Sequence, residues 1–134
     1  MRKYSALVIL IFSVLFIIAG YFVYTGYLRP LYDNNVSQTE TINLSQKKEL
    51  IFHKRDEQNK IFNVEIEING NTRSNFGLNI LDGNKSVHSA RIKGGSEVEF
   101  TYVNDWYSDS IVLLFEPEAF EEGTLEVECR FLSL

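Results

Sequence analysis

The side chains that could act as nucleophiles, bases or metal ligands are few and widely spaced. The chain has one cysteine, Cys129, and two histidines, His53 and His88. Cys129 has the same parity as the apolar residues around it, so it is predicted to be a buried apolar residue and not a nucleophile. Neither histidine has a second His or Cys at zinc-site spacing. Gly94-Gly95 lacks the Lys-Ser or helix start of a phosphate-binding loop. The sequence therefore predicts no catalytic residue, no metal site and no cofactor.

Carboxylates are abundant but arranged as surface residues. In an extended chain, side chains two residues apart point to the same face of a sheet. Acid–base catalysis instead needs two carboxyls in different environments within a cleft. The following pairs therefore predict a solvated sheet surface: Glu65/Glu67, Glu97/Glu99 and Glu126/Glu128. Four further oxygen donors match no calcium-binding loop signature: Asp82, Asn84, Asp105 and Asp109.

One polar loop is singled out as a candidate contact site. It carries Trp106-Tyr107 between Asp105 and Asp109. An exposed aromatic pair on a loop tip is a common contact for a protein partner or a sugar ring. The alternative is that Trp106 folds back and caps the end of the hydrophobic core. Both interpretations are open at this point.

An apolar segment near the N-terminus predicts that the rest of the chain lies beside a membrane. From Ala6 to Val23 only Ser13, Gly20 and Tyr21 are not plainly apolar. A helix of about 20 residues spans a hydrocarbon core of about 30 Å. We expect an uncleaved signal-anchor helix over 6–28, because the apolar run exceeds the roughly 7–15 residues of a signal-peptide core. A signal peptide cleaved near Ala19-Gly20 is the alternative.

The charges beside this segment predict its orientation. Arg2 and Lys3 precede it, and basic flanks favour the cytoplasmic side. We therefore expect residues 1–5 in the cytoplasm and the C-terminal part outside the cell membrane. Arg2, Lys3 and Arg29 are the only basic residues before Pro30, so the rest keeps 10 of the 13 Lys and Arg against all 18 Asp and Glu, a formal charge of −8. Such an acidic domain argues against nucleic acid as a partner.

The single cysteine also indicates the cellular context. Exported domains of this size often carry disulfides, and one cysteine cannot form one within the chain. This favours a Gram-positive bacterium or an archaeon.

The remaining chain is organised as a linker and a β domain. Residues 29–48 are mostly polar and predict a linker with little packing capacity. Near Glu49 either a short strand begins or Ser45 caps a helical turn. Alternating apolar residues then predict strands, separated by Gly, Asn and Asp turns such as 69–71 and 82–84, and 111–115 is apolar on both faces as in a central strand covered on each side. The predicted fold is all-β: an antiparallel β-sandwich, jelly-roll-like, of about 7–8 strands over 49–134.

Three features of the domain carry a resemblance: the run Phe76–Asp82, the run Ser110–Glu116, and Gly123 leading into an alternating last strand. This order resembles the jelly-roll domains of GOLD-like and PPC-like type on small bacterial and archaeal surface proteins with one N-terminal membrane helix. The resemblance implies a non-catalytic adhesion, cargo or accessory module. It supplies no residue set to carry over by position.

These observations lead to two hypotheses of different class. The first is a non-catalytic interaction module, anchored in the membrane, that binds another envelope protein or a surface polymer through Asp105, Trp106, Tyr107 and Asp109. The second is a structural or accessory subunit of a membrane or envelope complex, in which the helix makes the essential contact. A cleaved secreted domain or a small hydrolase is the third hypothesis.

Overall fold

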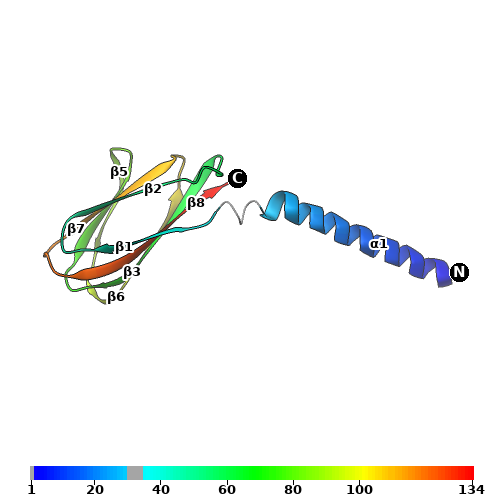
Figure 1. The fold of residues 1–134 in the computed structure, drawn as a ribbon, viewed down its shortest axis with the longest axis horizontal. Coiled ribbons are helices and arrows are strands. Elements are labelled where there is room, and N and C mark those ends of the chain that lie inside the picture. The colour runs from blue at the N-terminus through cyan, green and yellow to red at the C-terminus, as the bar shows by residue number, and fades with distance from the viewer. Residues whose placement is uncertain (1, 30–34) are drawn as a thin grey trace. The chain divides into compact units, whose positions relative to one another are not determined.

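The computed structural model describes residues 2–29 and 35–134, with side chains from residue 8. The chain divides into a helical unit up to residue 33 and a β domain after it, and each is described by itself (Figure 1). Residue 1 and residues 30–34, which include the first part of the predicted linker, lie outside the described residues.

The N-terminal unit consists of helix α1 (Arg2–Val23) continued by a π-helical turn, η1 (Tyr24–Leu28). Two hydroxyls donate back along the helix, Ser13 Oγ to Ile9 O and Thr25 Oγ1 to Tyr21 O, both at 2.9 Å. Such hydrogen bonds give a side-chain hydroxyl a partner where the surroundings are apolar. By length and composition the helix can cross a membrane from Val8 to Leu28, and a signal sequence would meet the same criterion.

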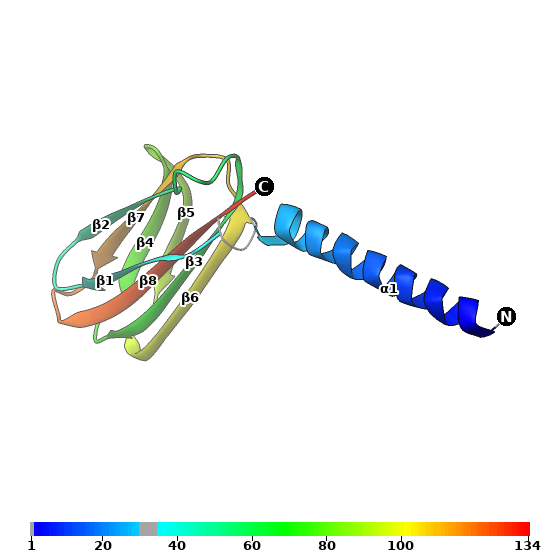
Figure 2. The same cartoon turned by 45° about the vertical axis from the view of Figure 1, so that its right-hand side comes forward.

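The β domain is a two-layer sandwich. Within the described residues it has eight strands: β1 (Gln38–Asn43), β2 (Lys48–His53), β3 (Ile61–Thr72), β4 (Phe76–Asp82), β5 (Lys85–Ile92), β6 (Gly95–Asp105), β7 (Ser110–Pro117) and β8 (Gly123–Ser133). We call the sheet with the order β1-β8-β3-β6 sheet A, and the sheet with the order β2-β7-β4-β5 sheet B (Figures 1 and 2). All pairings are antiparallel. The chain changes sheet at every connection except β4 to β5, which is the arrangement of a jelly roll. The predicted fold class is confirmed.

The core lies between the two sheets and follows the predicted alternation. Ile66 and Ile68 of β3 are fully buried, as are Leu113 and Phe115 of β7. The ring of Phe76 on β4 packs at 6.1 Å from that of Phe115, measured between centroids. Each such side chain contributes about 1.5–3 kcal/mol when its apolar surface leaves water. The core thereby fixes which side chains point outward.

The structure corrects the second half of the predicted linker 29–48. Gln38–Asn43 forms β1, an edge strand whose Ile42 is buried against the core. Leu44 is fully buried as well, and its backbone N–H donates to Gly123 O at 2.9 Å. The sequence signal was faint because an edge strand is held mainly by its backbone ladder and needs few apolar side chains.

The turn predicted at residues 69–71 is also wrong, because β3 runs through it to Thr72. Gly70 makes this possible, since its φ of 153° is a conformation that side chains rarely adopt. A Cβ at Gly70 would lie 2.2 Å from the carbonyl oxygen of Thr124 on β8. The glycine therefore marks a close approach of two strands within sheet A, with a register shift beside it, and not the end of a strand.

β7 is the predicted central strand, lying between β2 and β4 in sheet B. The prediction that it is covered on each side is wrong for the outer face. Ile111, Leu113 and Phe115 point into the core, whereas Val112 and Leu114 point outward and are only half-buried. Sheet B thus presents aliphatic side chains on its outer surface.

Candidate functional site

The loop between β6 and β7 is anchored by Trp106. Its indole is 4% exposed and belongs to the core cluster. Its backbone N–H donates to Phe62 O at 3.1 Å and its Nε1–H donates to Ser110 O at 3.2 Å. The interpretation in which Trp106 caps the core therefore describes the structure, and its ring is not open to a partner.

Tyr107, the next residue, is 73% exposed. Around it, Ser108 Oγ donates to Asp82 Oδ1 at 2.6 Å, and Lys54 Nζ lies 3.5 Å from Asp109 Oδ1. Asp105 is exposed at the end of β6. The structure thus brings Asp105, Tyr107 and Asp109 to one exposed tip, which we call the Tyr107 loop (residues 105–109). A buried Trp106 holds it in place.

The candidate calcium ligands do not form a cluster. Asp82 accepts from Ser108, Asp109 faces Lys54, and Asn84 is exposed in the turn after β4. Over residues 2–29 and 35–134 no group of three or more His, Cys, Asp or Glu side chains is arranged to hold a metal ion.

The two histidines lie far apart in sheet B, one on each edge strand. His53 ends β2 and is exposed. His88 on β5 packs against the rings of Tyr102 and Phe100, with centroid distances of 5.1 and 6.4 Å. The half-buried His88 thus packs on two aromatic rings, and within the described part of the chain it belongs to no metal-binding group.

Cys129 is fully buried in β8. Loss of solvation on burial raises the pKa of the Cys129 thiol to about 12. The thiolate, which is the reactive form, is therefore hardly populated at neutral pH. The buried position predicted for Cys129 is confirmed.

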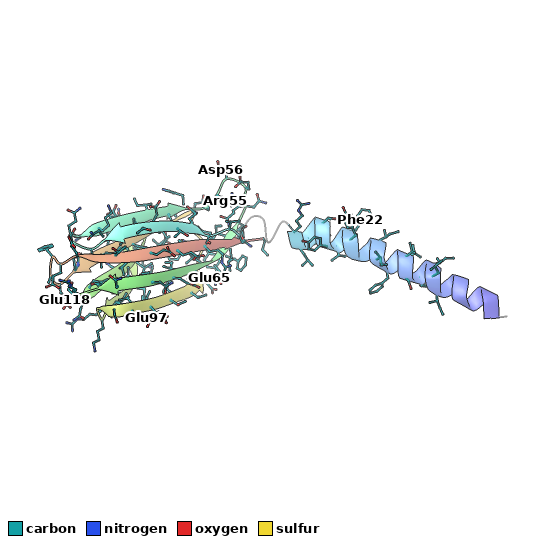
Figure 3. All side chains as sticks on the ribbon, turned by 60° about the horizontal axis from the view of Figure 1, so that its bottom comes forward. Phe22, Arg55, Asp56, Glu65, Glu97 and Glu118 are labelled. Atoms are coloured by element: carbon teal, nitrogen blue, oxygen red, sulfur yellow. The ribbon has the colours of Figure 1, made fainter. Side chains whose placement is uncertain are left out.

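The glutamate pairs converge on one surface, which the sequence alone did not indicate. Strands β8, β3 and β6 are neighbours in sheet A, and their outward positions carry Glu65, Glu67, Glu97, Glu99, Glu126 and Glu128. We call this surface the acidic face; Figure 3 shows Glu65 on β3 and Glu97 on β6. The guanidinium of Arg130 pairs with Glu65. The i, i+2 spacing was visible in the sequence, but the adjacency of the three strands follows from the topology.

Open depressions also mark the described surface of the domain, and two of the larger ones lie apart from the Tyr107 loop. One of about 660 Å³ lies where β3 ends and β6 and β8 begin, with a polar lining that includes Asn71, Arg73, Ser96 and Glu122. Another of about 480 Å³ lies on the outer face of sheet B, with a mostly aliphatic floor of Ile51, Leu81, Val112 and Leu114. Neither contains the residues of the Tyr107 loop.

Comparison with known proteins identifies a fold and no family. No family model matches the sequence, and no curated protein matches it either. Among solved structures the domain is similar to the mitogen of Yersinia pseudotuberculosis, with a TM-score of 0.52 and 9% identity over 72% of this chain and 86% of that one. It is also similar to the pre-peptidase C-terminal domain of a collagenase from Bacillus anthracis, with a TM-score of 0.50 and 12% identity over 70% of this chain and 89% of that one. The second likeness agrees with the expected PPC-like resemblance at the level of the fold.

Proposed function

We propose that this protein is a membrane-anchored, non-catalytic interaction module whose β domain lies outside the cell and binds another envelope protein through the Tyr107 loop. The observation that carries the proposal is the exposed ring of Tyr107 on a loop fixed by the buried Trp106. A preordered aromatic side chain loses little conformational entropy on binding, and this favours its use as a contact.

The helix supports the anchored state. Val8–Leu28 is long enough to span, and its Ser and Thr hydroxyls that donate back to the backbone avoid unsatisfied groups in lipid. Arg2 and Lys3 before it favour a cytoplasmic N-terminus. In the alternative of a cleaved signal peptide the same domain would be secreted.

Charge favours a protein over a surface polymer as the partner. Asp105 and Asp109 flank Tyr107, and 18 acidic residues in the chain all lie after residue 30. Many envelope polymers are polyanions and would be repelled, whereas a protein can place Lys or Arg opposite the two aspartates. The expected contact is a shallow pocket for the ring with a basic rim.

The test compares alanine substitutions of two exposed aromatic residues. The full-length variants are produced in the native host cells. Tyr107→Ala removes the proposed contact. Phe120→Ala is the matched control, because Phe120 is 78% exposed in the loop between β7 and β8. Cross-linking in intact cells should recover the same envelope protein with the wild type and Phe120→Ala, and lose it with Tyr107→Ala. Equal recovery with both variants would reject the Tyr107 loop as the contact.

Two further results would point to the alternatives. If the partner is lost only when residues 2–28 are replaced by an unrelated spanning helix, the protein is an accessory subunit held through its helix. If the chain sediments with purified surface polymer, and Tyr107→Ala abolishes this, the partner is the polymer. Mass spectrometry of the N-terminus decides between anchor and cleaved signal peptide.

A further inference from the structure

The outer faces of the two sheets differ in charge and polarity. The acidic face of sheet A carries six glutamates, with Arg130 as the cation paired to one of them. On sheet B, Ile51 of β2, Val112 of β7 and Leu81 of β4 lie side by side across three strands. We call these three residues the apolar row. Ile51 is 51% exposed, and the other two are half-buried.

Two pairs of opposite charge lie on the outer side of sheet B, toward the end where Gly77 pairs with Glu116 and Arg91. Lys47 Nζ donates to Glu116 Oε1 at 2.5 Å, and Arg91 donates twice to the carboxylate of Glu118, at 2.5 and 3.0 Å. The hydrogen bond from Arg91 lowers the pKa of Glu118. Sheet B therefore has a nearly neutral outer face with an aliphatic centre, which is the type of surface that protein interfaces cover.

The next row along the strands carries groups that complement each other. It consists of Glu49 on β2, Leu114 on β7 and Asn79 on β4. Asn79 Oδ1 accepts from Ser86 Oγ at 2.6 Å and from Ser89 Oγ at 3.0 Å, so the amide N–H groups of Asn79 are its remaining donors. Glu49 supplies an acceptor at the other end of the same row.

From this arrangement we infer that the outer face of sheet B is the interface between two copies of this chain. Two copies related by a two-fold axis parallel to β7 place each β2 over β4 of the other copy. Across the depressions that these residues line, Ile51 then faces Leu81, Val112 faces Val112 and Leu114 faces Leu114. Glu49 meets the amide of Asn79. An isologous interface needs this kind of self-complementarity.

The acidic face cannot serve in the same way. Any two-fold pairing of sheet A would bring glutamates of one copy against glutamates of the other, which costs free energy when they are desolvated. Of the two large faces of the sandwich, the one with the apolar row is thus compatible with a second copy.

The size of the face indicates a weak dimer that depends on the membrane. A two-fold axis along β7 overlaps three strands, β2, β7 and β4. With about 4.8 Å between strands and three rows about 6.7 Å apart, the overlap covers roughly 300 Å² per copy, about a third of a standard interface. Anchoring both copies in one membrane raises their effective concentration, as a linker does. The inference therefore rests on the anchored state proposed above.

The chain offers a clean cross-linking test, because its one native cysteine is inert. Cys129 is fully buried, so a single introduced cysteine reports on its own position. Full-length Val112→Cys should shift to the mass of a covalent dimer when membranes are treated with an oxidant or a short bismaleimide. Asn69→Cys, exposed on the central strand β3 of sheet A, is the control and should stay at the mass of the monomer. Equal cross-linking of the two variants would overturn the inference.

A second pair of variants tests the two-fold axis. Coexpressed Ile51→Cys and Leu81→Cys chains should yield more covalent dimer than either variant alone, since these positions face each other across the interface. Ile51→Glu in the Val112→Cys background should abolish the covalent dimer, while protease resistance shows that the domain is folded. Ile51 lies on an edge strand and is half exposed, so a charge there is compatible with the fold. No gain from the mixed pair, or no loss with Ile51→Glu, would reject this interface.

Failure here and failure of the proposed function give different results. A chain found in the medium with a shortened N-terminus would remove the anchor and with it the basis for a membrane-dependent dimer. A chain that stays in the membrane with an intact N-terminus, yet fails to cross-link through Val112→Cys, would overturn the dimer alone. Tyr107 belongs to neither of the two rows that would pair, so Tyr107→Ala should leave the cross-link unchanged.

Discussion

Glu67 on β3 lies directly opposite Glu128 on β8 in the middle of the acidic face. Like charges at directly paired positions destabilise a sheet. The pairing persists because the inward neighbours of Glu67, Ile66 and Ile68, are fully buried, and a shift of register by one residue would expose them. The burial of Ile66 and Ile68 therefore outweighs the repulsion between the carboxylates of Glu67 and Glu128.

Reversing one of these charges should stabilise the domain. Glu67→Lys places an ammonium opposite Glu128, and we expect the free energy of unfolding to rise by about 0.5–1 kcal/mol. The gain should nearly vanish at about 1 M salt, where the screening length is about 3 Å. Urea unfolding of the full-length chain in mild detergent, followed by the fluorescence of its one tryptophan, measures both. Glu67→Gln is the control and should gain less. A gain that does not respond to salt would contradict the electrostatic explanation.

The neighbouring aromatic residues Trp106 and Tyr107 should differ sharply in their effect on stability. Trp106→Ala empties a buried position and removes the bond to Ser110 O, so we expect a loss of about 3–5 kcal/mol. Tyr107→Ala removes an exposed ring and should change stability by less than about 0.5 kcal/mol. Urea unfolding followed by circular dichroism compares the two. Similar losses for both would mean that the Tyr107 ring also packs on the domain.

Gly70 and Gly83 should respond differently to the same substitution. Gly70→Ala drives a methyl group into the backbone of Thr124, and we expect a loss of about 2–4 kcal/mol. Gly83 has a φ of 58° with open space around it, so Gly83→Ala should cost only about 1–2 kcal/mol. The midpoints of urea unfolding rank the two variants. The reverse order would show that the strands can separate at Gly70 without penalty.

Stability should fall in alkaline solution through Cys129. Burial raises the pKa of this thiol from an ordinary 9.0 to about 12, so between these values the unfolded chain releases a proton that the folded chain keeps. The stabilising contribution is complete below pH 9 and decreases by about 1.4 kcal/mol per pH unit above it. Cys129→Ala should remove this slope. The difference between the two stability profiles from pH 8 to 11 measures the effect, and parallel profiles would refute it.

Much of the fold was predictable because the apolar alternation of each long strand is a local property. Ile66 and Ile68, or Leu113 and Phe115, differ from their outward neighbours by type alone, and this gave the strands and the core. β1 was missed because an edge strand with one buried side chain, Ile42, has almost no alternation. The continuation of β3 past Gly70 was missed because a Gly between two Asn residues has the composition of a turn.

The surfaces were less predictable than the fold, because the strand order decides which distant residues share a face. Each glutamate pair was visible, but only the strand order β8-β3-β6 places the three pairs on one face. The apolar row likewise joins residues from three strands that are distant in the sequence. For the Tyr107 loop, the sequence indicated the segment but could not decide between the contact and capping roles of Trp106. The burial of Trp106 depends on hydrogen bonds to Phe62 of β3 and Ser110 of β7, which are distant from each other in the sequence.

The contacts of Asn35 have a mechanical consequence. Its Oδ1 accepts from the backbone N–H of Ser133 at 2.9 Å and from Gln58 Nε2 at 3.3 Å, so the chain leading into β1 is fastened to the end of β8. When force is applied to the domain through the residues before Asn35, these two hydrogen bonds bear the load before the hydrogen bonds between β1 and β8 do. Force would then spread into the central strand β8, and the edge strand would not be peeled off one bond at a time. The two hydrogen bonds of Asn35 therefore protect β1 against force applied through the residues that precede it.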